Sequence, residues 1–76
     1  MELIALRCRI SELATARGWS MRELARRTGL SKSSLADYDN MKNDIPLRKA
    51  IILAKTLECR PEELHEYNDK EFAAFR

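Results

Sequence analysis

The sequence of 76 residues contains few of the residue types that build crosslinked or metal-bound domains. It has two cysteines, Cys8 and Cys59, and one histidine, His65. The cysteines lack the paired spacing to other Cys or His residues that a zinc site requires, so we expect two small apolar residues rather than a disulfide. A lone histidine among glutamates is typical of a surface residue. We therefore expect no metal and no cofactor.

Long apolar runs are also missing. The N-terminus has only Leu3-Ile4-Ala5-Leu6 between two charged residues, which predicts neither a signal peptide nor a membrane span. We expect a cytoplasmic protein with no membrane partner. No constellation of catalytic residues can be assembled around the single histidine, so the sequence does not indicate an enzyme.

The net charge is only +2, but it is unevenly distributed. Through Arg60 there are twelve Lys and Arg residues against seven Asp and Glu residues, and from Pro61 onward there are two against five. A basic body with an acidic end favours a polyanionic partner that contacts the body. We do not expect the acidic end to touch this partner.

Apolar residues at spacings of three and four predict an all-α domain of five helices, because this spacing gives each helix one apolar face. No alternation typical of a strand is present. The expected helices are one that carries Leu3, Leu6, Ile10 and Leu13 and ends at Gly18, then residues 21–28, residues 32 to about 40, one that begins at Pro46 and carries Leu47, Ala50, Leu53, Ala54 and Leu57, and residues 62 to about 67.

A tight turn is expected between the second and third helices. Ser20 is positioned as an N-cap with Glu23 three residues later, which predicts a capping box, and Ser31 is positioned to cap the next helix. Gly29 stands where a helix end requires a left-handed residue. The apolar residues expected to fix the crossing of the two helices are Leu24, Ala25, Leu30, Leu35 and Tyr38.

The stretch SMRELARRTGLSKSSL, residues 20–35, resembles the lambda-repressor-like (Cro/CI, Xre) helix-turn-helix family. The similarity continues through DIPL at residues 44–47 and LAKTLECRPEEL at residues 53–64, which resembles the compact single-domain branch of that family. The resemblance implies a helix-turn-helix formed by the second and third helices, in a DNA-binding domain of residues 1–67. Residues 68–76 are then a C-terminal tail.

Two positions depart from the family pattern. The family often ends its recognition helix with an acid, any residue and a glycine, whereas here Asp39 and Asn40 are followed by Met41. We expect Asn40 to take the left-handed conformation instead. Asp37 occupies a position from which the family commonly reaches DNA. A carboxylate there either accepts from a cytosine amino group or stays in water, and we favour water.

The resemblance implies a sequence-specific regulator of transcription, a repressor, that inserts its third helix in the major groove of double-stranded DNA. Lys32 is expected to donate to guanine, and the two capping serines with the helix amides are expected to hold phosphates. The residues expected to contact DNA are Ser20, Met21, Arg22, Ser31, Lys32, Ser33, Ser34, Asp37, Lys42 and Asn43. The alternative is that Ser20 and Ser31 are helix caps only and that Lys32 is an ordinary solvated residue.

A single recognition helix reads few base pairs, so we expect a symmetric homodimer. Because the basic face is taken by DNA, the contact is expected in the C-terminal third, where Tyr67, Phe72 and Phe75 are aromatic residues left over from the core. The alternative is that Phe72 and Phe75 pack on their own chain. A second function remains open, namely a protein-interaction module such as an antitoxin or adaptor that binds a protein partner through the same third.

Overall fold

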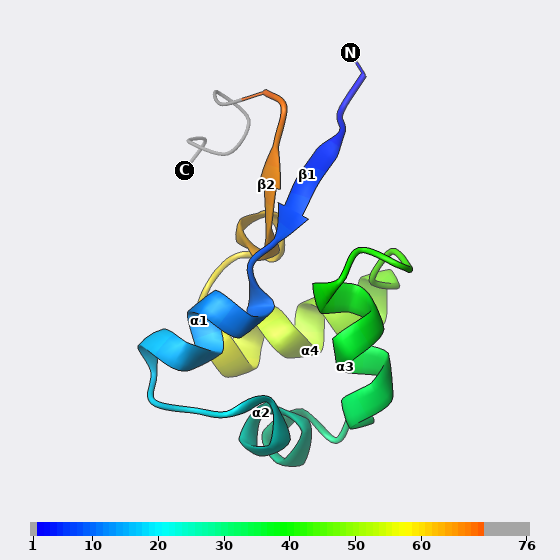
Figure 1. Ribbon diagram of the computed structural model, residues 1–76. Coiled ribbons are helices and arrows are strands. Elements are labelled where there is room, and N and C mark those ends of the chain that lie inside the picture. Colours follow the sequence, from blue (N-terminus) through cyan, green and yellow to red (C-terminus); the bar gives the residue numbers. More distant parts are fainter. Residues whose placement is uncertain (1, 70–76) are drawn as a thin grey trace.

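The computed structural model describes residues 2–69, which form a helical body carrying a two-stranded ribbon (Figure 1). In this part of the chain no helix is long and apolar enough to cross a membrane. The elements in chain order are β1 (Ala5–Cys8), α1 (Ile10–Ala16), α2 (Met21–Thr28), α3 (Lys32–Asp39), α4 (Leu47–Leu57), the 3-10 helix η1 (Pro61–Leu64) and β2 (His65–Tyr67).

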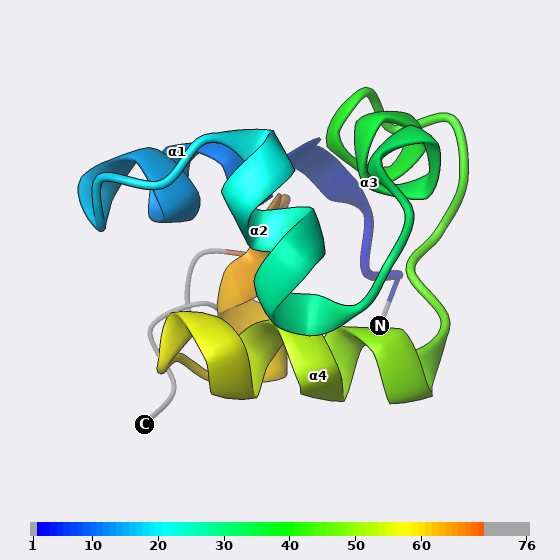
Figure 2. The same ribbon diagram turned by 90° about the horizontal axis from the view of Figure 1, so that it is seen from below.

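The helices surround one small core. Viewed from below, α2 lies in the middle, α4 runs along one side, and α1 and α3 lie on the other (Figure 2). Most inward positions predicted from the helical spacing are buried, because the apolar face of each helix can be covered only by the others. The buried core residues are Cys8, Ile10, Ala14, Leu24, Leu35, Tyr38, Leu53, Ala54, Leu57 and Leu64.

The expected first helix is wrong at its N-terminal half. Residues 5–8 form β1, and α1 begins only at Ile10. Leu3 and Leu6, which were expected on the buried face of this helix, are exposed. Their spacing fits a helix, but residues 5–8 pair as a strand with residues 65–67 instead. The apolar spacing within residues 3–13 gives no information about a strand partner so distant in sequence.

The expected fifth helix is also wrong beyond Leu64. After the single turn of η1, β2 runs antiparallel to β1, with Cys8 paired to His65 and Ala5 paired to Tyr67. Asn68 extends the ribbon, since its backbone N–H donates to the carbonyl of Ile4 at 2.9 Å. The two ends of the described chain therefore meet in a ribbon that projects from the helices (Figure 1). Phe72 and Phe75 lie outside the described residues.

The apolar stripe predicted on α4 is correct for Leu53, Ala54 and Leu57, which are buried, and wrong for Leu47, whose residue surface is 74% exposed. Leu47 is the first residue of the helix. Its side chain lies at the edge of the body, where too little of the rest of the chain remains to cover it.

The end of α3 differs from expectation by one residue. Asn40 has an ordinary φ of −89°, and Met41 takes the left-handed conformation with φ 63°. Met41 therefore occupies the position at which the resembling family often has glycine. A left-handed conformation is strained for a residue with a Cβ atom, so this turn stores a local cost.

We expect Met41→Gly to raise the free energy of unfolding by about 0.5–1 kcal/mol. Glycine removes a left-handed strain of about 1–2 kcal/mol and adds a smaller entropy cost in the unfolded chain. Thermal and urea unfolding measure the change. The matched control is Asn40→Gly at a negative φ, which should destabilise the protein. Equal stabilisation by both substitutions would contradict the left-handed placement of Met41.

Candidate nucleic-acid interface

The turn between α2 and α3 is fixed on both sides of its glycine. Gly29 has φ 75°, and its N–H donates to the carbonyl of Ala25 at 2.9 Å. Thr28 donates from Oγ1 to the carbonyl of Leu24 at 2.8 Å and accepts from the N–H of Leu30 at 3.2 Å. Sequence reasoning did not assign a role to this threonine, although a hydroxyl residue directly before the glycine was the available signal.

Both predicted serine caps are confirmed. Ser20 Oγ accepts from the N–H of Glu23, and Ser31 Oγ accepts from the N–H of Ser34, each at 3.1 Å. The Ser31 hydroxyl also donates to Ser34 Oγ at 2.8 Å. The caps leave both helix starts exposed at the surface, where their remaining N–H groups can meet an anion.

The predicted capping box is formed only in half, because the Glu23 carboxylate is used elsewhere. It accepts hydrogen bonds from the side chains of Arg26 and Arg27 on the next turn of α2. These bonds, that from Arg26 first, lower the pKa of Glu23 to about 2. A glutamate without such partners takes up a proton near pH 4.5, but Glu23 stays charged at that pH. Its ion pairs with Arg26 and Arg27 are lost only as the pH falls through about 2.

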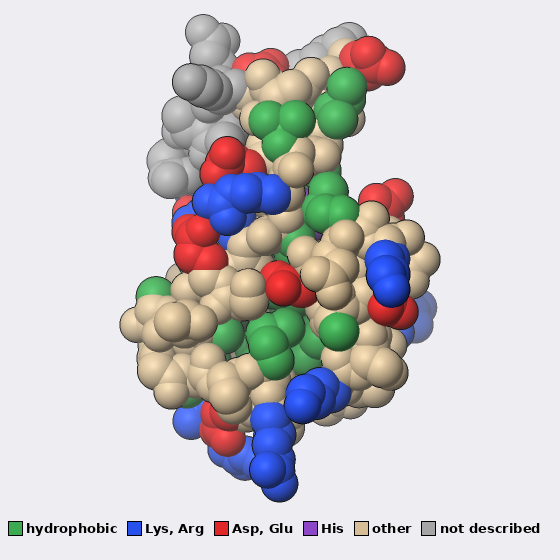
Figure 3. Space-filling model, in the orientation of Figure 1, with side chains coloured by type: hydrophobic (Ala, Val, Ile, Leu, Met, Phe, Trp, Pro, Cys, Tyr) green, Lys and Arg blue, Asp and Glu red, His purple; other side chains and the backbone are tan. Residues whose placement is uncertain are grey.

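These pairs decide which cations remain available on α2. Arg26 and Arg27 are partly neutralised by Glu23, whereas Arg22 is exposed and has no ion pair among the described residues. Lys32 and Lys42, at the two ends of α3, are likewise exposed and have no ion pair within residues 2–69. Basic side chains project from the end of the molecule formed by α2 and the start of α3, opposite the ribbon (Figure 3).

The loop that leads into α2 is held by Trp19, which packs against the core. The guanidinium groups of Arg17 and Arg27 lie 4.8 and 4.1 Å from the ring centroid of Trp19. Arg17 also binds Glu58, with 2.9 Å between Nη2 and Oε2, just after the end of α4. These contacts fix the backbone directly before Ser20, so the start of α2 has a defined direction.

The expected DNA-contacting residues are distributed over the starts of α2 and α3 and the loop after α3. Besides the serine caps, two further contacts lie within the protein. Met21 packs against the core and so offers its backbone rather than its side chain, and the carbonyl of Asp37 accepts from the N–H of Lys42 at 2.9 Å. Half-buried members are Met21, Ser34 and Asp37, and the exposed members are Ser20, Arg22, Ser31, Lys32, Ser33, Lys42 and Asn43.

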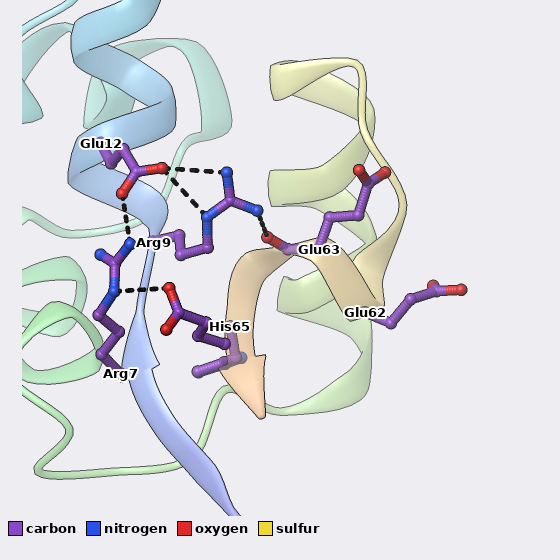
Figure 4. A pocket seen from close by; sticks show the side chains of 7 residues that line it. Arg7, Arg9, Glu12, Glu62, Glu63 and His65 are labelled. Carbon is purple, nitrogen blue, oxygen red and sulfur yellow. Dashed lines mark hydrogen bonds and ion pairs between the residues drawn. The ribbon is translucent and has the colours of Figure 1, made fainter. Parts of the chain in front are cut away.

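A second polar cluster lies at the base of the ribbon (Figure 4). Arg7 binds Glu12 at 2.8 Å and Glu66 at 2.9 Å, and Arg9 binds Glu12 at 3.0 Å. Hydrogen bonds from Arg7 and then Arg9 lower the pKa of Glu12. Burial lowers the pKa of His65 beside this cluster, which favours the neutral imidazole at pH 7. The ion pairs of Arg7 with Glu12 on α1 and with Glu66 on β2 join the ribbon to α1.

Comparison with known proteins identifies the family. Residues 9–70 match the Cro/C1-type HTH DNA-binding domain, a range that includes α1 to β2. The chain is also similar to the SPbeta prophage-derived uncharacterized HTH-type transcriptional regulator YopS of Bacillus subtilis (strain 168), with 36% identity over 61 residues, which is 79% of this chain and 82% of that protein. The resemblance found in the sequence is thus confirmed, and the chain belongs to the family of Cro/C1-type HTH DNA-binding domains.

Proposed function

We propose that this protein is a sequence-specific regulator of transcription, a repressor, that binds double-stranded DNA as a homodimer. Its DNA-binding domain is residues 1–67, and its helix-turn-helix is formed by α2 and α3. One observation carries the proposal: two serine-capped helix starts are joined by the Gly29 turn, and Lys32 and Ser33 are exposed on the first turn of the second of these helices. The first turn of a recognition helix is the part that reaches base edges.

The contacts divide into those that position the protein and those that read sequence. The hydroxyls of Ser20 and Ser31 and the first amides of α2 and α3 hold phosphates. Lys32 donates to guanine N7 or O6, with Ser33 beside it. The Ser31 O–H donates to Ser34 Oγ in the free protein, so it must turn away from Ser34 to reach a phosphate. The remaining roles are phosphate contacts by Arg22, Lys42 and Asn43 and a solvated carboxylate at Asp37.

The experiment that tests the proposal is selection of bound duplexes from a random DNA pool, followed by titration of the selected site at several salt concentrations. We expect enrichment of a pseudo-palindrome whose half-sites lie about 34 Å apart. Two or three phosphate contacts per protomer, from Arg22, Lys42 and in part Lys32, predict a log–log salt slope of about −2 to −3 per protomer. A pool without any enriched sequence contradicts specific binding.

Ser31→Ala is expected to destabilise the protein by about 1 kcal/mol and to weaken DNA binding, because it removes a helix cap and a phosphate donor together. Ser31→Asp separates the two roles, since aspartate caps a helix well but repels phosphate. We expect the Asp variant to keep its melting temperature and to lose DNA affinity. If it keeps both, Ser31 acts as a cap only.

The second candidate function is a protein-interaction module, such as an antitoxin or adaptor. It is favoured by an open groove between α4 and the C-terminal elements, lined mainly by apolar residues, and by the exposed apolar residues of α4. Apolar residues lining the groove are Ile45, Leu47, Ala50, Pro61, Leu64 and Tyr67. Tight binding to a protein partner without any affinity for duplex DNA would support this function over the first.

A further inference from the structure

Glu23 is the one acidic residue in the stretch of chain that forms most of the candidate interface. Residues 13–36 contain no other Asp or Glu, whereas the basic residues of this stretch are Arg17, Arg22, Arg26, Arg27 and Lys32. A carboxylate at this place repels phosphate and lowers the attraction of the surface for DNA. The carboxylate is not used to cap α2, because the hydroxyl of Ser20 supplies the cap by accepting from the backbone N–H of Glu23.

The carboxylate of Glu23 instead holds two arginine side chains at once. Arg26 binds both of its oxygens: Nε donates to Oε1 at 3.0 Å, and Nη2 donates to Oε2. Arg27 donates from Nε to Oε2 at 2.7 Å, and its guanidinium also lies over the ring of Trp19. Two parallel bonds between a guanidinium and a carboxylate are stronger than bonds between neutral groups, and they fix the orientation of the guanidinium.

The two arginines differ in what else holds them. Arg27 would keep its contact with Trp19 if Glu23 lost its charge. The side chain of Arg26 is 69% exposed, and within residues 2–69 its ion pair and side-chain hydrogen bonds are all with Glu23. Arg26 also lies four residues after the exposed Arg22, so the two side chains share one face of α2. Without the carboxylate, this face would therefore carry a second free cation.

We infer that Glu23 is a specificity-determining residue, which keeps the sequence-independent attraction to DNA low by holding Arg26 and, in part, Arg27. This role rests on the proposed binding of DNA and acts through the two arginines. Non-specific binding comes almost entirely from attraction between basic side chains and phosphates, so each free cation strengthens it. Glu23 would thus weaken binding to the wrong sequences.

The specific complex should depend less on these two arginines. In that complex the protein has one pose, which is set by the first turns of α2 and α3. Arg26 lies beyond the first turn of α2, about 6 Å further along the helix axis than Arg22. A non-specific complex has no fixed pose, so any free cation on this surface can approach a phosphate. Release of Arg26 therefore raises non-specific affinity more than specific affinity.

Ion pairs between residues three and four apart also stabilise a helix, and this is the alternative role of Glu23. A purely stabilising role would change the melting temperature of the protein. It would leave the salt dependence of DNA binding and the ratio of specific to non-specific affinity unchanged, as long as the protein is folded. These two quantities therefore distinguish the roles.

The test compares Glu23→Gln with the wild type on the selected site and on a duplex of scrambled sequence, in salt concentrations from about 0.1 M upward. We expect affinity for the scrambled duplex to rise about three- to tenfold and the ratio of specific to non-specific affinity to fall about threefold or more. The log–log salt slope on the scrambled duplex should become more negative by about 1, because one further phosphate contact releases about one counterion. All titrations are made below the lowest melting temperature of the variants.

Glu66→Gln is the matched control. It removes one negative charge that is also paired with an arginine, Arg7, but it lies on the ribbon at the end of the molecule opposite α2 (Figure 1). Charges act over only about 10 Å at 0.1 M salt, so both affinities should stay as in the wild type. An equal rise with Glu66→Gln would show that net charge, and not the release of Arg26, determines the effect, and would overturn the inference.

A double-mutant cycle with Arg26→Gln identifies the released cation. Because Glu23 neutralises Arg26, Arg26→Gln alone should change affinity for the scrambled duplex less than about twofold, but in the Glu23→Gln background it should remove most of the gain. A loss by the same factor in both backgrounds, no gain with Glu23→Gln, or an equal gain on both duplexes overturns the inference. A wild type that binds its selected site while Glu23→Gln behaves like it contradicts this inference alone, whereas a wild type that binds no duplex contradicts the proposed function as well.

Discussion

Gly29→Val is expected to lower the free energy of unfolding by about 1–3 kcal/mol and to abolish specific DNA binding. Gly29 has φ 75°, and a β-branched residue at a positive φ is strained by about this amount. A Cβ atom at this position would meet nothing within 4 Å, so the cost comes from the backbone and not from a clash. Relief of the strain moves α3 relative to α2, and the two helix starts then no longer fit one DNA surface. Chemical unfolding and a binding titration measure the two effects.

Gly18→Val is the matched control, because Gly18 has φ 77° and equally open surroundings. It should destabilise the protein by a similar amount. Since Gly18 lies between α1 and α2 and not within the proposed helix-turn-helix, binding to DNA should persist at temperatures where the variant is folded. Equal loss of binding in both variants would show that stability, and not the α2–α3 geometry, determines affinity. A Gly29→Val protein that melts and binds like the wild type would show that this turn is not required.

Lys32→Ala is expected to weaken specific binding by about 1–3 kcal/mol and to relax the preference at one base pair in each half-site. Lys32 is exposed on the first turn of α3 and has no ion pair within residues 2–69, so its removal leaves the fold unchanged. A duplex library that varies one position at a time measures both effects.

Two lysine controls separate a base contact from general charge. Lys42→Ala should weaken binding to all sequences by the same factor and reduce the salt slope by about 1, as loss of a phosphate contact does. Lys55→Ala, exposed on α4, should change neither quantity. If Lys32→Ala instead weakens binding to all sequences by the same factor, Lys32 contacts a phosphate, and neighbouring residues of α3 make the base contacts.

The proposed interface was predictable because its determinants are local. A serine cap can be recognised because its hydrogen-bond partner lies only three residues later in the sequence. A glycine at a helix end can be recognised because a left-handed φ angle there favours glycine over other residues. Ser20, Gly29 and Ser31 are found in the conformations that the sequence predicts. The α2 and α3 boundaries could be predicted for the same reason.

The ribbon was not predictable because its determinants are distant. Cys8 is paired with His65, 57 positions later, and nothing in the four residues of β1 identifies that partner. Likewise, the apolar spacing of residues 3–13 fits a helix as well as it fits a strand followed by a helix. Met41 was missed for a smaller reason: polar Asn40 is the better left-handed residue by intrinsic preference, but the turn after α3 places that conformation one residue later.

The pairing of β1 with β2 sets an order of events during synthesis. Residues 5–8 are translated well before residues 65–67, so their in-chain partner is made later than they are. Contacts among α1, α2 and α3 are close in sequence and can form earlier, whereas the ribbon closes last. Until then every nascent chain carries an apolar strand whose two edges are both unpaired. On a polysome, neighbouring nascent chains carry the same strand, and an unpaired edge can bind another chain.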